Sequence, residues 1–108
     1  MSVRAVNEND FASGIRQSGV TMAEFGAVWC PPCKALLPLL DELSDKHSET
    51  LTVLKVDCDE SPDLASRFGV MSMPTVIVFH DGEPVQKLVG LQPRSVYENA
   101  LAKYAVNA

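Results

Sequence analysis

Residues 29–34, Trp-Cys-Pro-Pro-Cys-Lys, constrain this chain more than any other stretch. The two cysteines, Cys30 and Cys33, are separated by two residues, a spacing that can close a small disulfide ring or supply half of a metal site. Both intervening residues are prolines, which fix φ and carry no backbone N–H. Pro32 suits the first turn of a helix, where its missing N–H would be unpaired anyway. We therefore expect the cysteines at the junction where a strand ends and a helix begins.

The apolar pattern predicts an α/β domain with a mixed sheet. Crossover helices separate the first strands, and an Asp-Gly pair at 81–82 predicts a hairpin turn near the end. Pro38 lies inside the second helix and should kink it rather than end it, because leucines at helical spacing continue on both sides. Strands are predicted over 3–6, 22–28, 51–58, 75–80 and 83–89, and helices over 11–18, 33–43, 61–68 and 93–104.

Length and charge restrict the function classes. A chain of 108 residues is expected to form one domain, spanning 1–108, with a single core. The net charge of −5 argues against nucleic acid or an anionic membrane as the main partner, and favours a free monomer. No apolar run approaches the ~20 residues that cross a bilayer. The N-terminus shows no signal-peptide core, so we expect a cytoplasmic protein.

The cysteine pair favours redox chemistry over metal binding. A cysteine at the start of a helix meets the positive end of the helix dipole, which stabilises its thiolate. Cys30 would then be the nucleophile, and Cys33, one turn later, would resolve the mixed disulfide. Zinc needs about four ligands, and beyond the pair the chain offers only Cys58, His47 and His80, none at paired spacing. We expect no metal, and we read Cys58 as a buried, inert side chain.

Five segments of the chain form a recognisable set: 23–34 (AEFGAVWCPPCK), 53–57 (VLKVD), 68–70 (FGV), 73–75 (MPT) and 81–82 (DG). In their order and spacing they resemble those of thioredoxins, and the match covers essentially the whole chain. The resemblance implies the thioredoxin fold, a central five-stranded mixed β-sheet flanked by four α-helices. It implies a thiol–disulfide oxidoreductase that reduces protein disulfides without an organic cofactor and receives electrons from an NADPH-dependent thioredoxin reductase.

The resemblance also implies a substrate-binding surface around the cysteines. It implies a cis peptide bond between Met73 and Pro74, with the Met73 backbone facing the disulfide and ready to pair with an extended substrate. Gly90 would let a substrate backbone approach closely. The residues expected on this surface are Trp29, Pro31, Pro32, Met73, Pro74, Val89, Gly90 and Leu91.

Glu24 and Lys55 complete the candidate catalytic residues with Cys30 and Cys33. Apolar neighbours on the strand predict that Glu24 is buried, and burial raises a carboxyl pKa, which makes it a plausible proton acceptor for a buried thiol. By resemblance Glu24 pairs across strands with Lys55. We hypothesise that Glu24 takes the Cys33 proton while Lys55 holds it in place. The alternative is an ion pair that is merely tolerated within the sheet.

Three positions depart from the common thioredoxin pattern. Pro31 stands where glycine is usual, Gly26 where tryptophan or another bulky residue is common, and Glu24 where aspartate is usual. Pro31 removes an N–H donor near the Cys30 sulfur and stiffens the loop, and Gly26 should loosen packing beneath the helix. The sequence therefore does not fix the reduction potential of the Cys30–Cys33 pair. An oxidase or isomerase with a less reducing disulfide remains an alternative, as does a non-catalytic thioredoxin-fold adaptor.

Overall fold

The computed structural model describes residues 2–105 and contains a five-stranded mixed sheet with four helices, as predicted. The strand order across the sheet is β1-β3-β2-β4-β5. The strands are β1 (Val3–Val6), β2 (Val20–Gly26), β3 (Leu51–Asp57), β4 (Thr75–His80) and β5 (Glu83–Val89). The helices are α1 (Phe11–Gly14), α2 (Pro31–Lys46), α3 (Pro62–Arg67) and α4 (Arg94–Ala105).

The connections explain the strand directions. Long segments that contain α1 and α2 join β1, β2 and β3, which pair in parallel with β3 between the other two. The last two strands are joined only by Asp81 and Gly82, and a two-residue connection gives an antiparallel pair. Both turn residues have positive φ, 51° and 90°, as the favoured hairpin turn requires. Strand β4 also pairs antiparallel with β2, which makes the sheet mixed.

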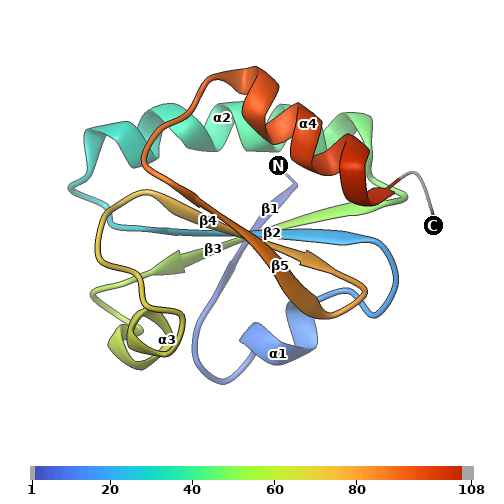
Figure 1. Ribbon diagram of the computed structural model, residues 1–108. Helices are drawn as coiled ribbons and strands as arrows, with labels where there is room; N and C mark the ends of the chain where they lie inside the picture. The colour runs from blue at the N-terminus through green and yellow to red at the C-terminus, as the bar shows by residue number, and fades with distance from the viewer. Residues whose placement is uncertain (1, 106–108) are drawn as a thin grey trace.

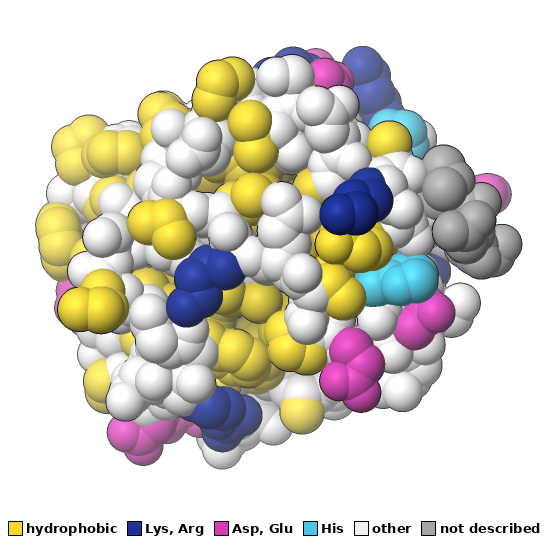
Figure 2. Space-filling model, viewed as in Figure 1, with side chains coloured by type: hydrophobic (Ala, Val, Ile, Leu, Met, Phe, Trp, Pro, Cys, Tyr) yellow, Lys and Arg dark blue, Asp and Glu magenta, His cyan; other side chains and the backbone are white. Residues whose placement is uncertain are grey.

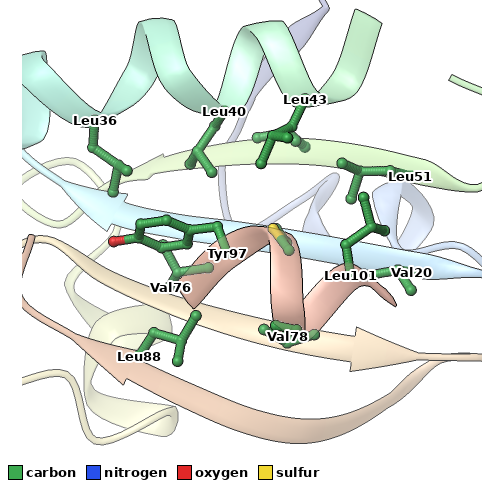
Figure 3. Close-up of a cluster of buried hydrophobic side chains, with 13 residues drawn as sticks. Val20, Leu36, Leu40, Leu43, Leu51, Val76, Val78, Leu88, Tyr97 and Leu101 are labelled. Atoms are coloured by element: carbon green, nitrogen blue, oxygen red, sulfur yellow. The ribbon is translucent and has the colours of Figure 1, made fainter. Parts of the chain in front are cut away.

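Helices cover both faces of the sheet, with α2 and α4 on one side and α1 and α3 on the other (Figure 1). Beneath α2 and α4, Leu36, Leu40 and Leu43 point from α2 towards the sheet, where they meet Tyr97 of α4 (Figure 3). A second buried cluster on the opposite face is built around Phe11, Phe25 and Phe79. Packing on these two faces fixes the carboxyl end of β2 and the amino end of α2, and the cysteines lie where these two ends meet.

The predicted bounds of the second strand and of the first helix were wrong. The second strand runs over 20–26 rather than 22–28, because pairing with β3 carries it from Val20 to Gly26, while Val28 is 72% exposed. The first helix ends at Gly14 rather than near residue 18, since Ile15 is already extended. The Arg16 N–H donates to the Thr21 hydroxyl oxygen at 2.9 Å, which turns the chain into β2.

Helix α2 continues through Pro38, as the leucine spacing predicted, and has 16 residues. It begins at Pro31, one residue before the proline that was expected in its first turn, because both prolines fit that turn. In the described part of the chain, no helix has the length and apolar character needed to cross a bilayer.

Candidate active site

Cys30 and Cys33 form a disulfide at the junction between β2 and α2, with their Cα atoms 5.3 Å apart. Antiparallel pairing brings the end of β2 beside the start of β4, so Met73 packs against the two cysteines. The Met73–Pro74 peptide bond is cis, as the resemblance implied. The fold thus brings together, at one edge of the sheet, segments that are about 40 residues apart in sequence.

Cys30 occupies the N-cap position of α2. Its sulfur accepts a hydrogen bond from the Cys33 backbone N–H at 3.4 Å. Pro31 and Pro32 carry no N–H, so Cys33 supplies the first backbone donor of the helix. The helix dipole and this donor both favour negative charge on the Cys30 sulfur. In the oxidised protein both cysteines are buried, Cys30 being 4% and Cys33 2% exposed.

Glu24 lies in the middle of the sheet and is only 2% exposed. Burial raises the pKa of Glu24 from 4.5 to about 7, and this is the largest influence on it. Lys55 lowers the pKa, and Asp57 raises it. The Oε2 atom of Glu24 is buried without a hydrogen-bond partner among the described residues. A carboxyl group that titrates near neutrality can accept a proton from a thiol at physiological pH.

Lys55 is the register partner of Glu24 on the neighbouring strand, as the resemblance implied. Its side chain is exposed, however, and within residues 2–105 the two side chains form no ion pair within 4.0 Å. Lys55 therefore acts on Glu24 through space rather than by direct contact. The expectation that Lys55 holds the carboxylate in place is not supported by this geometry.

A cavity of about 550 Å³ opens beside the disulfide, on the side of β1 and β3. Glu24, Gly26 and Cys33 form part of its wall, and Lys55 and Asp57 contribute charged groups. The cavity adjoins Gly26, but the packing is not loose at the missing side chain itself, because Glu24 and Cys33 fill that space. The cavity gives solvent a route to the otherwise buried carboxyl group of Glu24.

An exposed apolar surface surrounds the disulfide. Trp29 is 61% exposed, Val89 49% and Leu91 48%, and Val28 and Met71 are also exposed. Figure 2 shows hydrophobic side chains gathered on the left of the molecule, the end where Figure 1 places the start of α2. Exposed apolar groups around a reactive centre are typical of a protein-binding surface.

The other residues expected on this surface lie close to the disulfide. Pro31 and Pro32 are exposed in the first turn of α2, and Pro74 is buried. Gly90 has φ of 78°, and its N–H donates to the Pro74 carbonyl oxygen at 2.7 Å. Apart from its chain neighbours, no atom of residues 2–105 would lie within 4 Å of a Cβ at Gly90, so open space lies above it.

The contact between Asp59 and Trp29 was not predicted from the sequence. The indole N–H of Trp29 donates to Asp59 Oδ2 at 2.7 Å and anchors the exposed ring beside the disulfide. Asp59 belongs to an acidic group, Asp57, Asp59, Glu60 and Asp63, whose composition on its own is typical of a solvated turn. One feature of the sequence could have indicated this contact. Trp29 follows β2 and Asp59 follows β3, and the carboxyl ends of these two parallel strands lie side by side.

Asp59→Ala is expected to free the indole ring while changing the stability by less than about 1 kcal/mol, because the bond is exposed. Trp29 is the only tryptophan in the chain, so fluorescence reports this site alone. The fluorescence anisotropy of Trp29 should fall. Glu60→Ala, which removes a neighbouring acid, should leave the anisotropy unchanged, and equal anisotropy in both variants would contradict the anchoring role.

Cys58 is half-buried rather than fully buried. Burial raises the pKa of the Cys58 thiol to about 11, with Glu24, Asp57 and Asp59 adding to the rise. The thiol therefore stays protonated near neutral pH, which agrees with an inert side chain. Among the described residues, no group of three or more His, Cys, Asp or Glu side chains is arranged to hold a metal ion.

The chain is similar to known thioredoxins over nearly its whole length. A family model described as Thioredoxin matches residues 2–103. The thioredoxins of Staphylococcus saprophyticus and Staphylococcus haemolyticus are 44% and 45% identical to it over 104 residues, which is 96% of this chain and 99% of each relative. The solved structure of a mutant thioredoxin from Halobacterium salinarum has a TM-score of 0.89 at 32% identity, covering 96% of this chain and 91% of that chain.

These similarities agree with the geometry of the site. The structure has the disulfide at the start of α2, the cis bond before Pro74 and the five-stranded mixed sheet that the resemblance to thioredoxins implied. The chain belongs to the thioredoxin family and is a thiol–disulfide oxidoreductase whose redox centre is the Cys30–Cys33 pair.

Proposed function

We propose that the protein reduces disulfide bonds of other proteins in the cytoplasm, as a monomer that acts as one domain over 1–108. The observation that carries this proposal is the Cys30–Cys33 disulfide at the start of α2, set in an exposed apolar surface. A shallow surface of this kind suits an extended protein segment better than a small molecule. Electrons would come from an NADPH-dependent thioredoxin reductase, with no metal or organic cofactor in the chain itself.

The proposed reaction has two exchange steps. The Cys30 thiolate attacks one sulfur of the substrate disulfide, forming a mixed disulfide and releasing the other substrate sulfur as a thiolate, which takes a proton from water. Cys33 then loses its proton and attacks the Cys30 sulfur. The Cys30–Cys33 bond forms, the mixed disulfide breaks and the second substrate thiolate leaves, taking up a proton from water as the first did. The substrate disulfide thus gains two electrons and two protons, and the protein becomes oxidised.

Glu24 is the proposed proton acceptor for Cys33. Its buried Oε2 atom and its pKa of about 7 support this role, because the carboxylate and the thiol can exchange a proton without a large energetic penalty. Lys55 would tune that pKa through space. The other reading, in which Glu24 and Lys55 are only structural, predicts no effect of Glu24 on the second exchange step.

Substrates would bind on the apolar surface. Trp29 and Met73 flank the disulfide, and the open space above Gly90 leaves room for a substrate backbone. Pro31, Pro32, Pro74, Val89 and Leu91 complete the proposed docking surface. The Met73 backbone would pair with the substrate as a neighbouring strand does.

The direction of the reaction is tested by coupling the protein to NADPH and thioredoxin reductase, with insulin as the disulfide substrate. We expect NADPH consumption and insulin precipitation that both depend on this protein. A double Cys30→Ser, Cys33→Ser variant should be inactive, whereas an adaptor would keep its function. Failure with insulin, together with rapid oxidation of reduced substrate proteins, would instead support the oxidase reading that Pro31 leaves open.

A further inference from the structure

Gly26 is buried at the end of β2, where the backbone does not require a glycine. The glycines with positive φ are Gly19, Gly69, Gly82 and Gly90, and Gly26 is not among them. A glycine inside a strand weakens it and often marks the close approach of another group. The reason for Gly26 must therefore lie in the space beside it.

That space is filled by Glu24 and Cys33. A Cβ atom at position 26 would overlap Glu24 Oε2 and would lie 2.9 Å from Cys33 Sγ and 3.1 Å from Cys33 Cβ. Glu24 and Gly26 are two residues apart on one strand, so both face the same side of the sheet. The oxygen and the sulfur both lie within 3 Å of this position, so the gap between them is small enough for one water molecule to bridge.

We propose that Gly26 is a positioning residue for the second exchange step: its missing side chain leaves the space through which the Glu24 carboxyl group reaches Cys33. The inference rests on the proposed role of Glu24 as proton acceptor. It also links two departures from the usual pattern, because the longer acid at 24 extends into the volume that a side chain at 26 would fill.

A methyl group at position 26 forces one of the two neighbours to move. Cys33 lies buried in the first turn of α2, whereas the Glu24 carboxyl group is the end of a flexible side chain. The carboxyl group would turn into the adjoining cavity, which it already lines. There it meets more water and no longer reaches the sulfur, so its pKa falls towards the ordinary value of 4.5.

The test follows the two exchange steps separately. Reduced protein is mixed with 5,5′-dithiobis(2-nitrobenzoate) in a stopped-flow instrument: the first thionitrobenzoate reports attack by Cys30, and the second reports resolution by Cys33. Gly26→Ala should slow the second phase by about 10-fold or more near pH 8 and leave the first phase within about 2-fold. Gly14→Ala is the matched control, because this buried glycine lies in α1 and the nearest atoms that a Cβ there would meet belong to the side chains of Leu54 and Val6.

Coupling between the two positions distinguishes positioning from general damage. Glu24→Asp alone should slow the second phase, because the shorter acid falls short of the sulfur, but in the Gly26→Ala background it should cost nothing further. If the two slowing factors instead multiply, the residues act independently and the inference is overturned. Urea unfolding of each variant separates these rates from losses of stability.

The pKa of Glu24, measured by carboxyl-carbon NMR, separates this inference from the proposed function. If Gly26→Ala lowers that pKa while Glu24→Gln leaves the second phase unchanged, Gly26 positions the carboxyl group but the proton-acceptor role is wrong. If Glu24→Gln slows the second phase while Gly26→Ala changes neither the pKa nor the rate, the role of Glu24 stands and the inference about Gly26 is overturned.

Discussion

Cys33→Ser is expected to stop turnover after a single covalent event. Its Cys30 thiolate can still attack a substrate disulfide, but no second thiol is present to resolve the product. One equivalent of mixed disulfide should therefore accumulate, stable for as long as external thiols are absent. Intact-protein mass spectrometry measures the adduct directly, and the insulin assay should show a complete loss of catalytic turnover.

Cys30→Ser is the matched variant, and it should give neither turnover nor a comparable adduct. The remaining thiol of the pair, Cys33, is 2% exposed in the oxidised protein, and its backbone N–H faces the Cys30 sulfur rather than its own. Cys58→Ser should behave like the wild type in both assays, because the high pKa of Cys58 keeps it a thiol. The assignment of nucleophile and resolving thiol would be reversed if Cys30→Ser trapped the substrate and Cys33→Ser did not.

Glu24→Gln is expected to slow the second exchange step by about 100-fold at pH 8, the lower end of the usual range for a positioned base. In the wild type this step should accelerate as the pH rises through about 7, where Glu24 loses its proton. Glutamine accepts no proton, so the variant should lack that inflection. Identical pH profiles of the second phase in the two proteins would show that the proton leaves Cys33 by another route.

The same substitution should stabilise the oxidised protein at high pH. The pKa of Glu24 is about 7 in the folded chain and 4.5 ordinarily, so between these values the unfolded chain releases the proton more readily. Stability therefore falls as the pH rises from about 4.5 to 7, and the loss above pH 7 is about 3 kcal/mol. Glu24→Gln removes this loss, so it should be more stable than the wild type at pH 8 and nearly equal at pH 4.

Urea unfolding at pH 4 and pH 8 checks this prediction. Glu60→Gln is a suitable control, because it removes an exposed carboxyl group near the same cavity and should not change the pH dependence. A Glu24→Gln variant with wild-type stability at pH 8 would mean that the buried carboxylate is solvated well enough to ionise at its ordinary pKa. Slower catalysis together with greater stability would identify Glu24 as a group retained for function.

The order of elements and the mixed sheet were predictable because apolar periodicity and turn residues act locally. The Asp81-Gly82 turn and the leucines of α2 are examples in which local preference and tertiary packing agree. The wrong element boundaries arose where local preference and tertiary packing disagree. Val28 continues an apolar run but lies outside the sheet, because strand β3 ends opposite Gly26, and no local signal reveals where a neighbouring strand stops.

The site was predictable in its residues but not in its contacts. Cys30, Cys33 and Glu24 could be named from the chain, yet the bond from Trp29 to Asp59 joins residues 30 apart and depends on parallel pairing of β2 with β3. The exposure of the Lys55 side chain could not be predicted either. Strand register places Lys55 opposite Glu24 but does not determine in which direction its long side chain extends. The space at Gly26 follows only from the packing of Glu24 and Cys33 around it.

The spacing of Cys30 and Cys33 has a consequence for how partners distinguish the two redox forms. Residues three apart along a helical turn have Cα atoms about 5 Å apart whether or not they are bonded, and here that distance is 5.3 Å with the bond closed. The bond can therefore open without unwinding α2 or moving the sheet. The two redox forms therefore present nearly the same backbone to their partners. A reductase must nevertheless bind only the oxidised form, and a substrate only the reduced form. They must discriminate by the state of two sulfur atoms and the side chains touching them.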